Sequence, residues 1–591
     1  MNFKIVLPRW ISVTVLTLVM TACMSSPSGS PSGSASGSTL GSTSAPAAGR
    51  NPAGALSLVP LAACASLAGS MPAAVVGLPS GAVTIRSAQA QEPAPLRTQD
   101  NAPTPAAGVV PATPAYCRVQ GHIAPLDPNA PNIEFQINLP QTWNGRTVQY
   151  GGGGFNGVLI SGLTLVPSAP YDQATPLAKG YVTYGTDSGH QNKPNTPPQA
   201  FALNDEALNN FAFASYKKVR DVAVETTKRY YGQAPAKLYF VGSSEGGREG
   251  MLMVQKFPAD FDGVYSRVPV LNWTGLQMFG TRSGMSLMGT NWINPNKARL
   301  VGKAVDASCD LLDGAADGII GDYEGCLKRF DPAVLRCAGG ADGGDQCLSD
   351  GQIAAIKALR SPLQYATTLE NGVSSYPGYG IGGEALEGIG PTGGWSSWWS
   401  GRNAPSVPAA PNNGIIWFFG AGTIQYLVAQ DANYDITKFT PSSFPQRLRT
   451  ISKLMDMTDP DLTAFHARGG KLIIKEHMAD YAQSPYAGIN YYQSVVTKMG
   501  QGKVNDFVRL YVAPGVDHVG YGAPANIDML TLLSDWVEQN RAPGSSGPLV
   551  HTEQDSKPPF AVKRARPMCE YPKVPRFKGG DMALANSFSC E

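Results

Sequence analysis

The segment that decides the fold is Lys237-Leu-Tyr-Phe-Val-Gly-Ser-Ser-Glu-Gly-Gly-Arg-Glu-Gly-Met-Leu252. Its apolar start is typical of a buried strand, a G-x-S-x-G turn follows, and the remainder is compatible with a helix. This is the order of a nucleophile elbow, in which small residues flank a sharp turn and the central serine projects above a sheet. Gly242 and Gly246 flank Ser244, whereas a motif centred on the preceding serine would lack both glycines. The segment therefore predicts an α/β fold of the α/β-hydrolase type, with Ser244 as the nucleophile.

A serine hydroxyl is a weak nucleophile at neutral pH, and it needs an imidazole base that a carboxylate orients. In α/β-hydrolases the acid and then the histidine follow the nucleophile in the chain, each after a late strand. His518 follows the strand-like run 507–513 and a Pro-Gly turn, and Asp480 follows the strand-like run 471–475. The pattern predicts Ser244, Asp480 and His518 as a catalytic triad.

The remaining histidines fit the role of the base less well than His518. Two precede the nucleophile and two lie in polar segments that favour surface positions; they are His122 and His190, and His466 and His551, respectively. His477 follows a strand, but it stands three residues before Asp480, which favours a structural role near the site. Asp517 is adjacent to the base, so its side chain is expected to point elsewhere.

Acyl transfer also needs hydrogen-bond donors for the developing oxyanion. One is the backbone N–H of the residue after the nucleophile, Glu245. The second is expected from a glycine-rich loop after an early strand, and Thr147-Val-Gln-Tyr-Gly-Gly-Gly-Gly-Phe-Asn-Gly157 fits this description. A surface loop or a phosphate cradle is the alternative, although the Lys-Ser/Thr pair of a P-loop does not follow.

An acidic loop, Cys309-Asp-Leu-Leu-Asp-Gly-Ala-Ala-Asp-Gly-Ile-Ile-Gly-Asp322, lies in the middle of the chain. Asp310, Asp313 and Asp317 alternate with small residues whose carbonyl groups can turn inward, a pattern that suits a hard cation such as calcium. The loop lacks the closing glutamate of an EF-hand. A solvated acidic loop without an ion is the alternative.

The composition indicates a small-molecule partner and an exported protein. The 46 basic and 44 acidic residues give a formal charge of +2 without a Lys/Arg run, which argues against nucleic acid or an anionic membrane surface. Charged residues make up only 15%, beside 66 Gly and 48 Pro, as in loop-rich extracellular proteins. The length of 591 residues allows one large domain with an insertion, or several domains.

The N-terminus has the features of an export signal. Two basic residues precede an apolar run at 11–20 that is too short to span a bilayer permanently. The residues Met-Thr-Ala before Cys23 resemble a bacterial lipobox. We predict a signal peptide at 1–22 and a lipid anchor on Cys23, with plain cleavage as the alternative. Residues 23–60 are rich in Ser, Gly, Pro and Ala and are predicted to form a flexible linker.

Nine cysteines are present, and lipidation of the first leaves eight, an even number that predicts four disulfides in an oxidising compartment. Proximity in the chain favours three pairs, and elimination gives a fourth; they are Cys309–Cys326, Cys337–Cys347, Cys569–Cys590 and Cys64–Cys117. No CxxC spacing occurs, which argues against structural zinc.

With these motifs placed, the sequence from about Cys64 to the C-terminus resembles the tannase and feruloyl esterase family. The resemblance rests on several segments in the same order: Cys64-Ala-Ser-Leu, Tyr116-Cys-Arg-Val, Leu139-Pro-Gln-Thr-Trp-Asn-Gly-Arg, the loop 151–157, Thr186-Asp-Ser-Gly-His, 243–250 and Pro567-Met-Cys.

The resemblance implies a hydrolase core, 61–271 and 463–591, interrupted by a lid domain at 272–462. It assigns the second oxyanion donor to Gly154 and an aromatic substrate contact in the lid to Trp398.

The resemblance also implies that the acidic loop holds a structural calcium ion. The ligands would be the carboxylates of Asp310, Asp313 and Asp317 and the carbonyl groups of Ala315 and Ile319.

Two positions depart from the family pattern. Members usually carry a disulfide between the residue before the nucleophile and the residue after the histidine, and here these are Ser243 and Val519. MHETase-like members use a lid arginine to bind the free carboxylate of the substrate. Arg402 is the arginine between Trp395 and Gly420, and it does not match that position.

The expected function is hydrolysis of esters of aromatic, hydroxycinnamic-type acids through an acyl-serine intermediate, as in a feruloyl esterase. Tannase or MHETase-like activity is the alternative within the same class. A non-catalytic phenolic- or carbohydrate-binding lipoprotein on a hydrolase scaffold is the alternative from another class. The sequence leaves the oligomeric state open.

Overall fold

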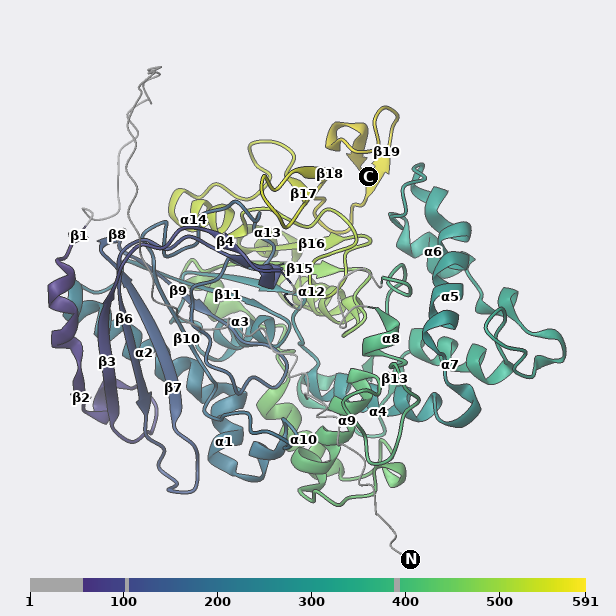
Figure 1. Cartoon of the computed structure of the whole chain (residues 1–591), viewed down its shortest axis with the longest axis horizontal. Helices are drawn as coiled ribbons and strands as arrows, with labels where there is room; N and C mark the ends of the chain where they lie inside the picture. Colours follow the sequence, from purple (N-terminus) through teal and green to yellow (C-terminus); the bar gives the residue numbers. More distant parts are fainter. Residues whose placement is uncertain (1–56, 101, 103–105, 387–393) are drawn as a thin grey trace, which may run out of the picture.

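A computed structural model describes residues 57–100, 102, 106–386 and 394–591 (Figure 1). Its centre is a ten-stranded sheet in the order β16-β15-β12-β11-β9-β10-β7-β6-β3-β2. The strands of this sheet are β2 (Gly69–Met71), β3 (Val83–Gln91), β6 (Tyr116–Ile123), β7 (Ile133–Pro140), β9 (Arg146–Tyr150), β10 (Val182–Thr186), β11 (Lys237–Ser243), β12 (Gly263–Arg267), β15 (Lys471–His477) and β16 (Val508–Ala513).

The sheet has a parallel half and an antiparallel half. From β10 to β16 every neighbouring pair is parallel, while β7, β6, β3 and β2 pair antiparallel. Parallel strands are covered on both faces and therefore consist mainly of apolar residues, as β11 does. The predicted α/β-hydrolase fold is confirmed, with the elbow strand β11 inside the parallel half.

Helices cover both faces of the parallel half. The helices of the core are α1 (Asp205–Asn209), α2 (Ser215–Tyr231), α3 (Glu245–Lys256), α12 (Pro485–Met499), α13 (Gln501–Phe507) and α14 (Met529–Gln539). Alternate residues of a strand face opposite sides of the sheet. Tyr239 and Val241 pack in the cluster that contains α14, and Phe240 packs with α3 in the cluster of the other face. This packing fixes β11, and with it the turn that follows.

A long insertion separates two neighbouring strands of the sheet. β12 and β15 pair in parallel, and most of the chain between them, 268–470, forms a helical layer beside the sheet (Figure 1). Its helices are α4 (Trp273–Ser286), α5 (Pro295–Cys309), α6 (Tyr323–Arg329), α7 (Asp350–Arg360), α8 (Trp395–Trp398), α9 (Ile415–Thr423), α10 (Pro445–Met455) and α11 (Thr463–Ala467). The lid range 272–462 falls inside this insertion, and one buried apolar cluster continues from the insertion into the core.

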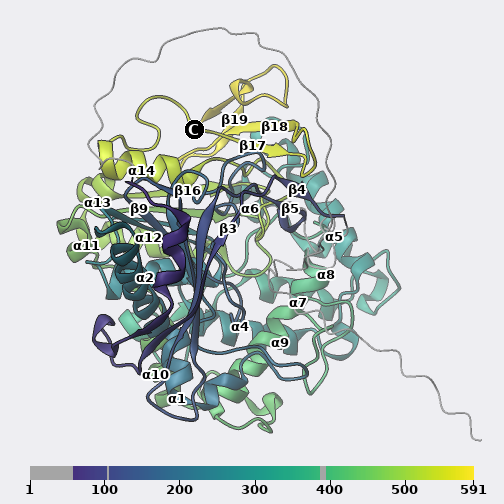
Figure 2. The same ribbon diagram turned by 60° about the vertical axis from the view of Figure 1, so that its left-hand side comes forward.

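Short strand pairs form small sheets separate from the ten-stranded sheet. They are β1 (Ser57–Leu58) with β8 (Thr142–Trp143), β4 (Arg97–Thr98) with β5 (Val109–Val110), β13 (Leu363–Gln364) with β14 (Ser375–Tyr376), β17 (Val550–Gln554) with β18 (Val562–Pro567), and β19 (Pro575–Phe577) with β20 (Phe588–Cys590). Figure 2, like Figure 1, places the C-terminal pairs at one end of the molecule, close to α6 of the insertion.

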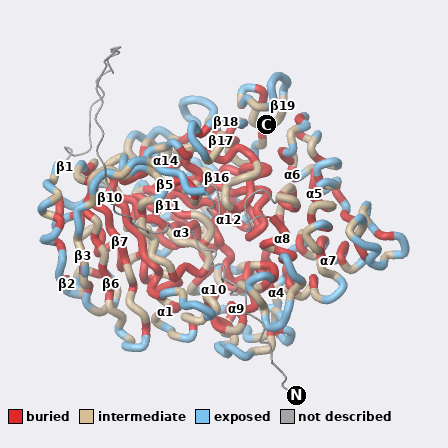
Figure 3. Tube along the Cα trace, viewed as in Figure 1, coloured by how far each residue is buried: buried red, intermediate tan, exposed pale blue. Residues whose placement is uncertain are grey.

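The four disulfides are formed as predicted. Their Cα–Cα distances lie between 4.9 and 5.5 Å. Figure 3 shows buried residues in the centre of the sheet and exposed residues at its β2–β3 edge and at the periphery. Because disulfide bonds form and persist in an oxidising compartment, the protein is exported.

The predicted signal peptide, Cys23 and most of the predicted linker lie outside the described residues. The end of the linker is an exception, because Ser57 and Leu58 pair with Trp143 and Thr142. The flexible segment was therefore predicted a few residues too long. Among the residues that the structure describes, no helix has the length and apolar character needed to cross a membrane.

Candidate active site

The turn after β11 has the geometry of a nucleophile elbow. Ser244 stands between the end of β11 and the start of α3 with φ 61° and ψ −122°, a strained conformation for a residue other than glycine. A Cβ on Gly242 would lie 2.1 Å from the carbonyl oxygen of Gly246. A Cβ on Gly246 would lie 2.7 Å from the carbonyl oxygen of Gly152, so both flanking positions have to be glycine.

The three predicted triad residues form one chain of hydrogen bonds. His518 Nε2 lies 2.9 Å from Ser244 Oγ, and its Nδ1 lies 2.7 Å from Asp480 Oδ2. The other carboxylate oxygen of Asp480 accepts from the N–H groups of Ala482 and Gln483. Because the carboxylate accepts from Nδ1–H, Nε2 is left as the acceptor for the serine proton.

The parallel topology explains why these distant residues meet. Ser244 follows β11, Asp480 follows β15 and His518 follows β16, so all three leave the carboxyl ends of parallel strands at one edge of the sheet. The acid and the base are buried, whereas the serine is partly exposed.

Two backbone N–H groups, one in the glycine loop and one directly after the serine, are available as oxyanion donors. Within the described residues, the N–H groups of Gly154 and Glu245 donate to no protein acceptor, whereas the N–H groups of residues 151–153 are all hydrogen-bonded. Gly154 has φ 59°, and a Cβ there would contact only the ring of Phe419. This pair of free donors fits an oxyanion hole.

A buried polar network that sequence reasoning missed fixes the glycine loop. Glu249, one turn along α3, accepts from the N–H of Gly152 at 2.9 Å and from Asn156 Nδ2 at 2.7 Å. Asn156 in turn accepts from the N–H of Gly153. Burial raises the pKa of Glu249, and the hydrogen bond from Asn156 opposes this shift. The network couples the loop that carries Gly154 to the helix that starts at the nucleophile.

Aromatic side chains from the insertion and the core surround the reacting groups. Trp398 of α8 lies 5.6 Å from the ring of His518 and 5.8 Å from Tyr481, measured between ring centroids. Phe419 of α9 lies 6.3 Å from Trp398 and 5.0 Å from Phe155. The structure thus brings Trp398 to the site, as predicted, together with Phe419 and Tyr481, which the sequence did not single out.

The comparison with known families agrees with the esterase geometry of the site. Residues 117–591 match the model of the tannase and feruloyl esterase family. The chain belongs to this family. It is a carboxylic ester hydrolase, and its substrate is a small-molecule ester.

Relatives match the esterase over most of its length. An uncharacterised esterase of Agrobacterium fabrum is 34% identical and covers 93% of this chain and 95% of its own. The mono(2-hydroxyethyl) terephthalate hydrolase of Piscinibacter sakaiensis is 32% identical, with 82% and 86% covered. The crystal structure of feruloyl esterase B from Aspergillus oryzae superposes with a TM-score of 0.71 at 24% identity, covering 90% of this chain and all of that one. This last likeness shows the shared fold.

The remaining polar residues near the triad have structural roles. Asp517 points away from His518 and accepts from the N–H groups of residues 519–521, which shapes the histidine loop. His477 is fully buried, and its Nδ1 lies 2.6 Å from the carbonyl oxygen of Asp517. Both residues are structural, as predicted, although the buried Nε2 of His477 has no hydrogen-bond partner among the described residues.

The prediction of a surface position for His551 is wrong. The residue lies on β17, is 3% exposed, and has a pKa well below its usual value because of burial. The C-terminal strand pair packs back onto the core, and that contact is not visible in a polar sequence. His466 is half-exposed beside Asp506, as expected for a surface residue.

The acidic loop connects α5 to α6, and the disulfide Cys309–Cys326 closes it. Its carboxylates accept hydrogen bonds from backbone N–H groups of the same loop. Asp310 accepts from the N–H groups of residues 317 and 318, and Asp313 accepts from Ala315 N–H. Within the described residues, Ala315 N–H is the hydrogen-bond donor to Asp313, and Oδ2 of this carboxylate has none. Burial, together with the negative charge of its neighbours, raises the pKa of Asp313 to about 6.

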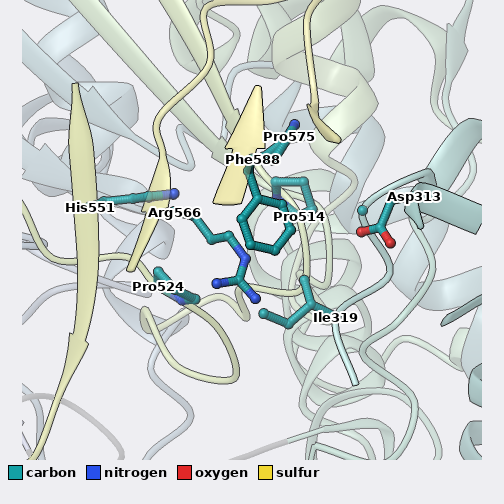
Figure 4. Close-up of a pocket in the computed structure, with 9 residues that line it drawn as sticks. Asp313, Ile319, Pro514, Pro524, His551, Arg566, Pro575 and Phe588 are labelled. Carbon is teal, nitrogen blue, oxygen red and sulfur yellow. The ribbon is translucent and has the colours of Figure 1, made fainter. Parts of the chain in front are cut away.

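The third carboxylate of this loop has a cationic partner from the C-terminal strands. Asp317 forms an ion pair with Arg566 of β18, and its first oxygen accepts from Ile319 N–H. Asp313, Ile319 and Arg566 line the same small pocket between the insertion and these strands (Figure 4). Among the described residues, no three acidic, histidine or cysteine side chains converge closely enough to hold a metal ion.

Proposed function

We propose that this esterase hydrolyses esters of aromatic, hydroxycinnamic-type acids through an acyl-serine intermediate on Ser244. The observation that carries the proposal is the continuous hydrogen-bond chain from Ser244 through His518 to Asp480, together with two N–H groups, of Gly154 and Glu245, that have no acceptor in the described part of the chain. Nucleophile, base, orienting acid and oxyanion donors are the complete set that acyl transfer needs.

The geometry supports the following sequence of steps. Ser244 Oγ attacks the ester carbonyl carbon while His518 Nε2 takes the hydroxyl proton. The carbonyl oxygen becomes an oxyanion that accepts from the N–H groups of Gly154 and Glu245. His518 then gives its proton to the leaving alcohol oxygen, which produces the acyl-serine. A water molecule repeats the attack with the same base, and the acid is released from Ser244.

The aromatic side chains around the triad support an aromatic acyl group. Trp398 and Tyr481 provide ring surfaces next to His518, and Phe419 packs against Trp398. Aromatic pairs gain stabilisation beyond the area they bury. The names of relatives in the same family point the same way, because they include feruloyl esterases and a terephthalate-ester hydrolase.

Labelling with a fluorophosphonate probe, combined with a panel of esters, tests the proposal. We expect one covalent adduct on Ser244 and turnover of methyl ferulate by the same preparation. A non-catalytic binding protein would react with neither. Turnover confined to aliphatic esters would contradict the aromatic assignment while leaving the mechanism intact.

The esterase is expected to prefer neutral phenolic esters over monoesters with a second free carboxylate. Arg402, the arginine between Trp395 and Gly420, is exposed to solvent rather than buried beside the aromatic rings. Burying a carboxylate without a cation or donors costs several kcal/mol. We therefore expect a higher kcat/KM for methyl ferulate than for mono(2-hydroxyethyl) terephthalate. The reverse order would point to a cationic substrate contact and to MHETase-like activity.

We also propose that the acidic loop binds calcium as a structural ion. The donor set consists of oxygen atoms, from the carboxylates of Asp310, Asp313 and Asp317 and the carbonyl groups of Ala315 and Ile319, as a hard cation requires. A Cβ on Gly321 would lie 2.0 Å from Asp313 Oδ2, so glycine keeps the space at this oxygen open. Because no three acidic side chains converge among the described residues, the three carboxylates would have to move together on binding, and Asp317 would have to exchange part of its contact with Arg566 for the ion.

Removal of calcium should lower stability more than it lowers turnover. An ion bound by the folded state alone stabilises it by mass action. Within the described residues, Asp310, Asp313 and Asp317 make no hydrogen bond to the triad, although Ile319 packs with Val516 of the histidine loop. We expect a chelator to lower Tm and calcium to restore it, with kcat of the remaining folded enzyme unchanged. Purified protein without calcium by elemental analysis, and with the same Tm in chelator, would indicate a loop stabilised by Arg566 alone.

For the N-terminus we propose removal of residues 1–22 and attachment of lipid to Cys23. The apolar run before a small-residue motif and a cysteine supports this assignment. Mass spectrometry of the mature N-terminus distinguishes a lipid-modified Cys23 from plain cleavage.

A further inference from the structure

Arg267 is a buried cation at the centre of the catalytic edge of the sheet. It is the last residue of β12, which lies between the nucleophile strand β11 and the acid strand β15. Its side chain is only 4% exposed. Its backbone carbonyl accepts from the N–H of Ser244 at 3.0 Å, so the main chain of β12 already supports the elbow.

The guanidinium of Arg267 connects two loops that carry catalytic residues. Nε donates to Ser243 Oγ at 2.8 Å, and Nη1 donates to the carbonyl oxygen of Val519 at 3.4 Å and to Ser168 Oγ at 3.3 Å. Ser243 directly precedes the nucleophile Ser244, and Val519 directly follows the base. One planar side chain therefore contacts both the elbow and the histidine loop.

Burying the charge of Arg267 lowers the stability of the folded state. Burial lowers the pKa of Arg267, which reflects the cost of removing its charge from water. A second buried cation, Lys475, is its register partner on β15 and adds like-charge repulsion. The nearby carboxylates of Asp480 and Asp517 offset part of this cost. Apolar residues of similar volume often stabilise a core as well as a buried ion does.

We propose that Arg267 is a positioning residue that sets the separation of Ser244 and His518 by bridging Ser243 and Val519. The inference rests on the proposed triad mechanism. The planar guanidinium presents donors in fixed directions, so the two loops it joins are held at a defined spacing. Looser loops would leave the Nε2–Oγ hydrogen bond longer for most of the time, and misplacement by about 1 Å can cost about 10²-fold in rate.

Two substitutions separate the bridge from packing and from charge. Arg267→Met fills similar space without donors or charge, and Arg267→Lys keeps a charge but offers one flexible donor group instead of a planar fork. We expect kcat for methyl ferulate to fall about 10²-fold in the methionine variant, with KM changed less than about 3-fold. We expect kcat of the lysine variant to exceed that of the methionine variant by less than about 10-fold, which is half of the loss on a logarithmic scale.

Fluorophosphonate labelling distinguishes positioning from a loss of folded protein. A smaller folded fraction lowers the final extent of labelling, whereas a misplaced base lowers the rate at which each site reacts. We expect full extent and a rate reduced in parallel with kcat. A wild-type rate in Arg267→Met, or full recovery of kcat in Arg267→Lys, would overturn the bridge.

If Arg267→Met does not fold, Ser243→Ala tests the same inference, because this variant removes only the hydrogen-bond acceptor of Arg267 Nε. We expect this variant to fold and to lose a few-fold in labelling rate, and an unchanged rate contradicts the inference. If wild-type protein itself fails to react with the probe, the triad mechanism is at fault rather than the role of Arg267.

Discussion

Replacing Ser244 with alanine is expected to lower kcat for ester hydrolysis by at least about 10³-fold. The free N–H groups of Gly154 and Glu245 would remain in place and could still polarise the carbonyl group, but no protein oxygen would be positioned to attack it. Because the side chain is small and only partly buried, we expect Tm to stay near that of the wild type. Steady-state kinetics and a thermal melt measure both quantities.

The matched control is Ser243→Ala, one residue earlier in the same turn. Its hydroxyl accepts from Arg267, whereas the base His518 is hydrogen-bonded to Ser244, so we expect the variant to retain activity within about 10-fold of the wild type. A comparable loss in both variants would show that the elbow has been placed in the wrong frame. Loss in Ser243→Ala alone would assign the nucleophile to that residue.

The elbow and the triad could be predicted because their constraints are local. The sharp turn requires small residues at Gly242 and Gly246, and the clash distances measured in the structure explain why. Once the nucleophile is fixed, chain order and the positions after strands restrict the acid to Asp480 and the base to His518. The cysteine pairs are similar, since three of them close loops of 10 to 21 residues.

The contacts that join distant segments could not be read from the sequence. Phe419 meets Trp398 and Phe155 because the insertion returns to the sheet edge, and nothing in its local sequence indicates which face of α9 turns inward. In the sequence, Arg267 looks like any arginine at the end of a strand. Its contacts with Ser243 and Val519 become visible only once the segments that follow β11 and β16 are placed beside β12. His551 was misassigned for the same reason, because polar neighbours concealed a packed strand.

The acidic loop shows the limit of motif reasoning. The spacing of Asp310, Asp313 and Asp317 predicts a cluster of carboxylates, but within the described residues no three such side chains converge on one point. The sequence does not reveal that Arg566, 249 positions beyond Asp317, supplies a positive charge to it. Whether a loop of this kind depends on an ion is decided by such long-range partners as much as by its own residues.

Replacing Asp480 with asparagine should lower kcat by about 10³ to 10⁴-fold without disturbing the fold. The amide has almost the same shape, and its oxygen can still accept from the N–H groups of Ala482 and Gln483. Its NH₂ group would then face His518 Nδ1 and favour the tautomer in which Nδ1 is the acceptor. The proton would move to Nε2, which could no longer take the proton of Ser244.

Asp517→Asn is the matched control for this substitution, because it alters the carboxylate next to the base in the chain. Burial raises the pKa of Asp517 to about 6, and its Oδ1 accepts from three N–H groups of the histidine loop, contacts that an amide oxygen can also make. We therefore expect less than about a 10-fold loss of kcat. If instead Asp517→Asn inactivates the enzyme while Asp480→Asn retains most of its activity, the orienting acid is Asp517. The hydrogen bond between Asp480 and His518 would then be incidental to catalysis.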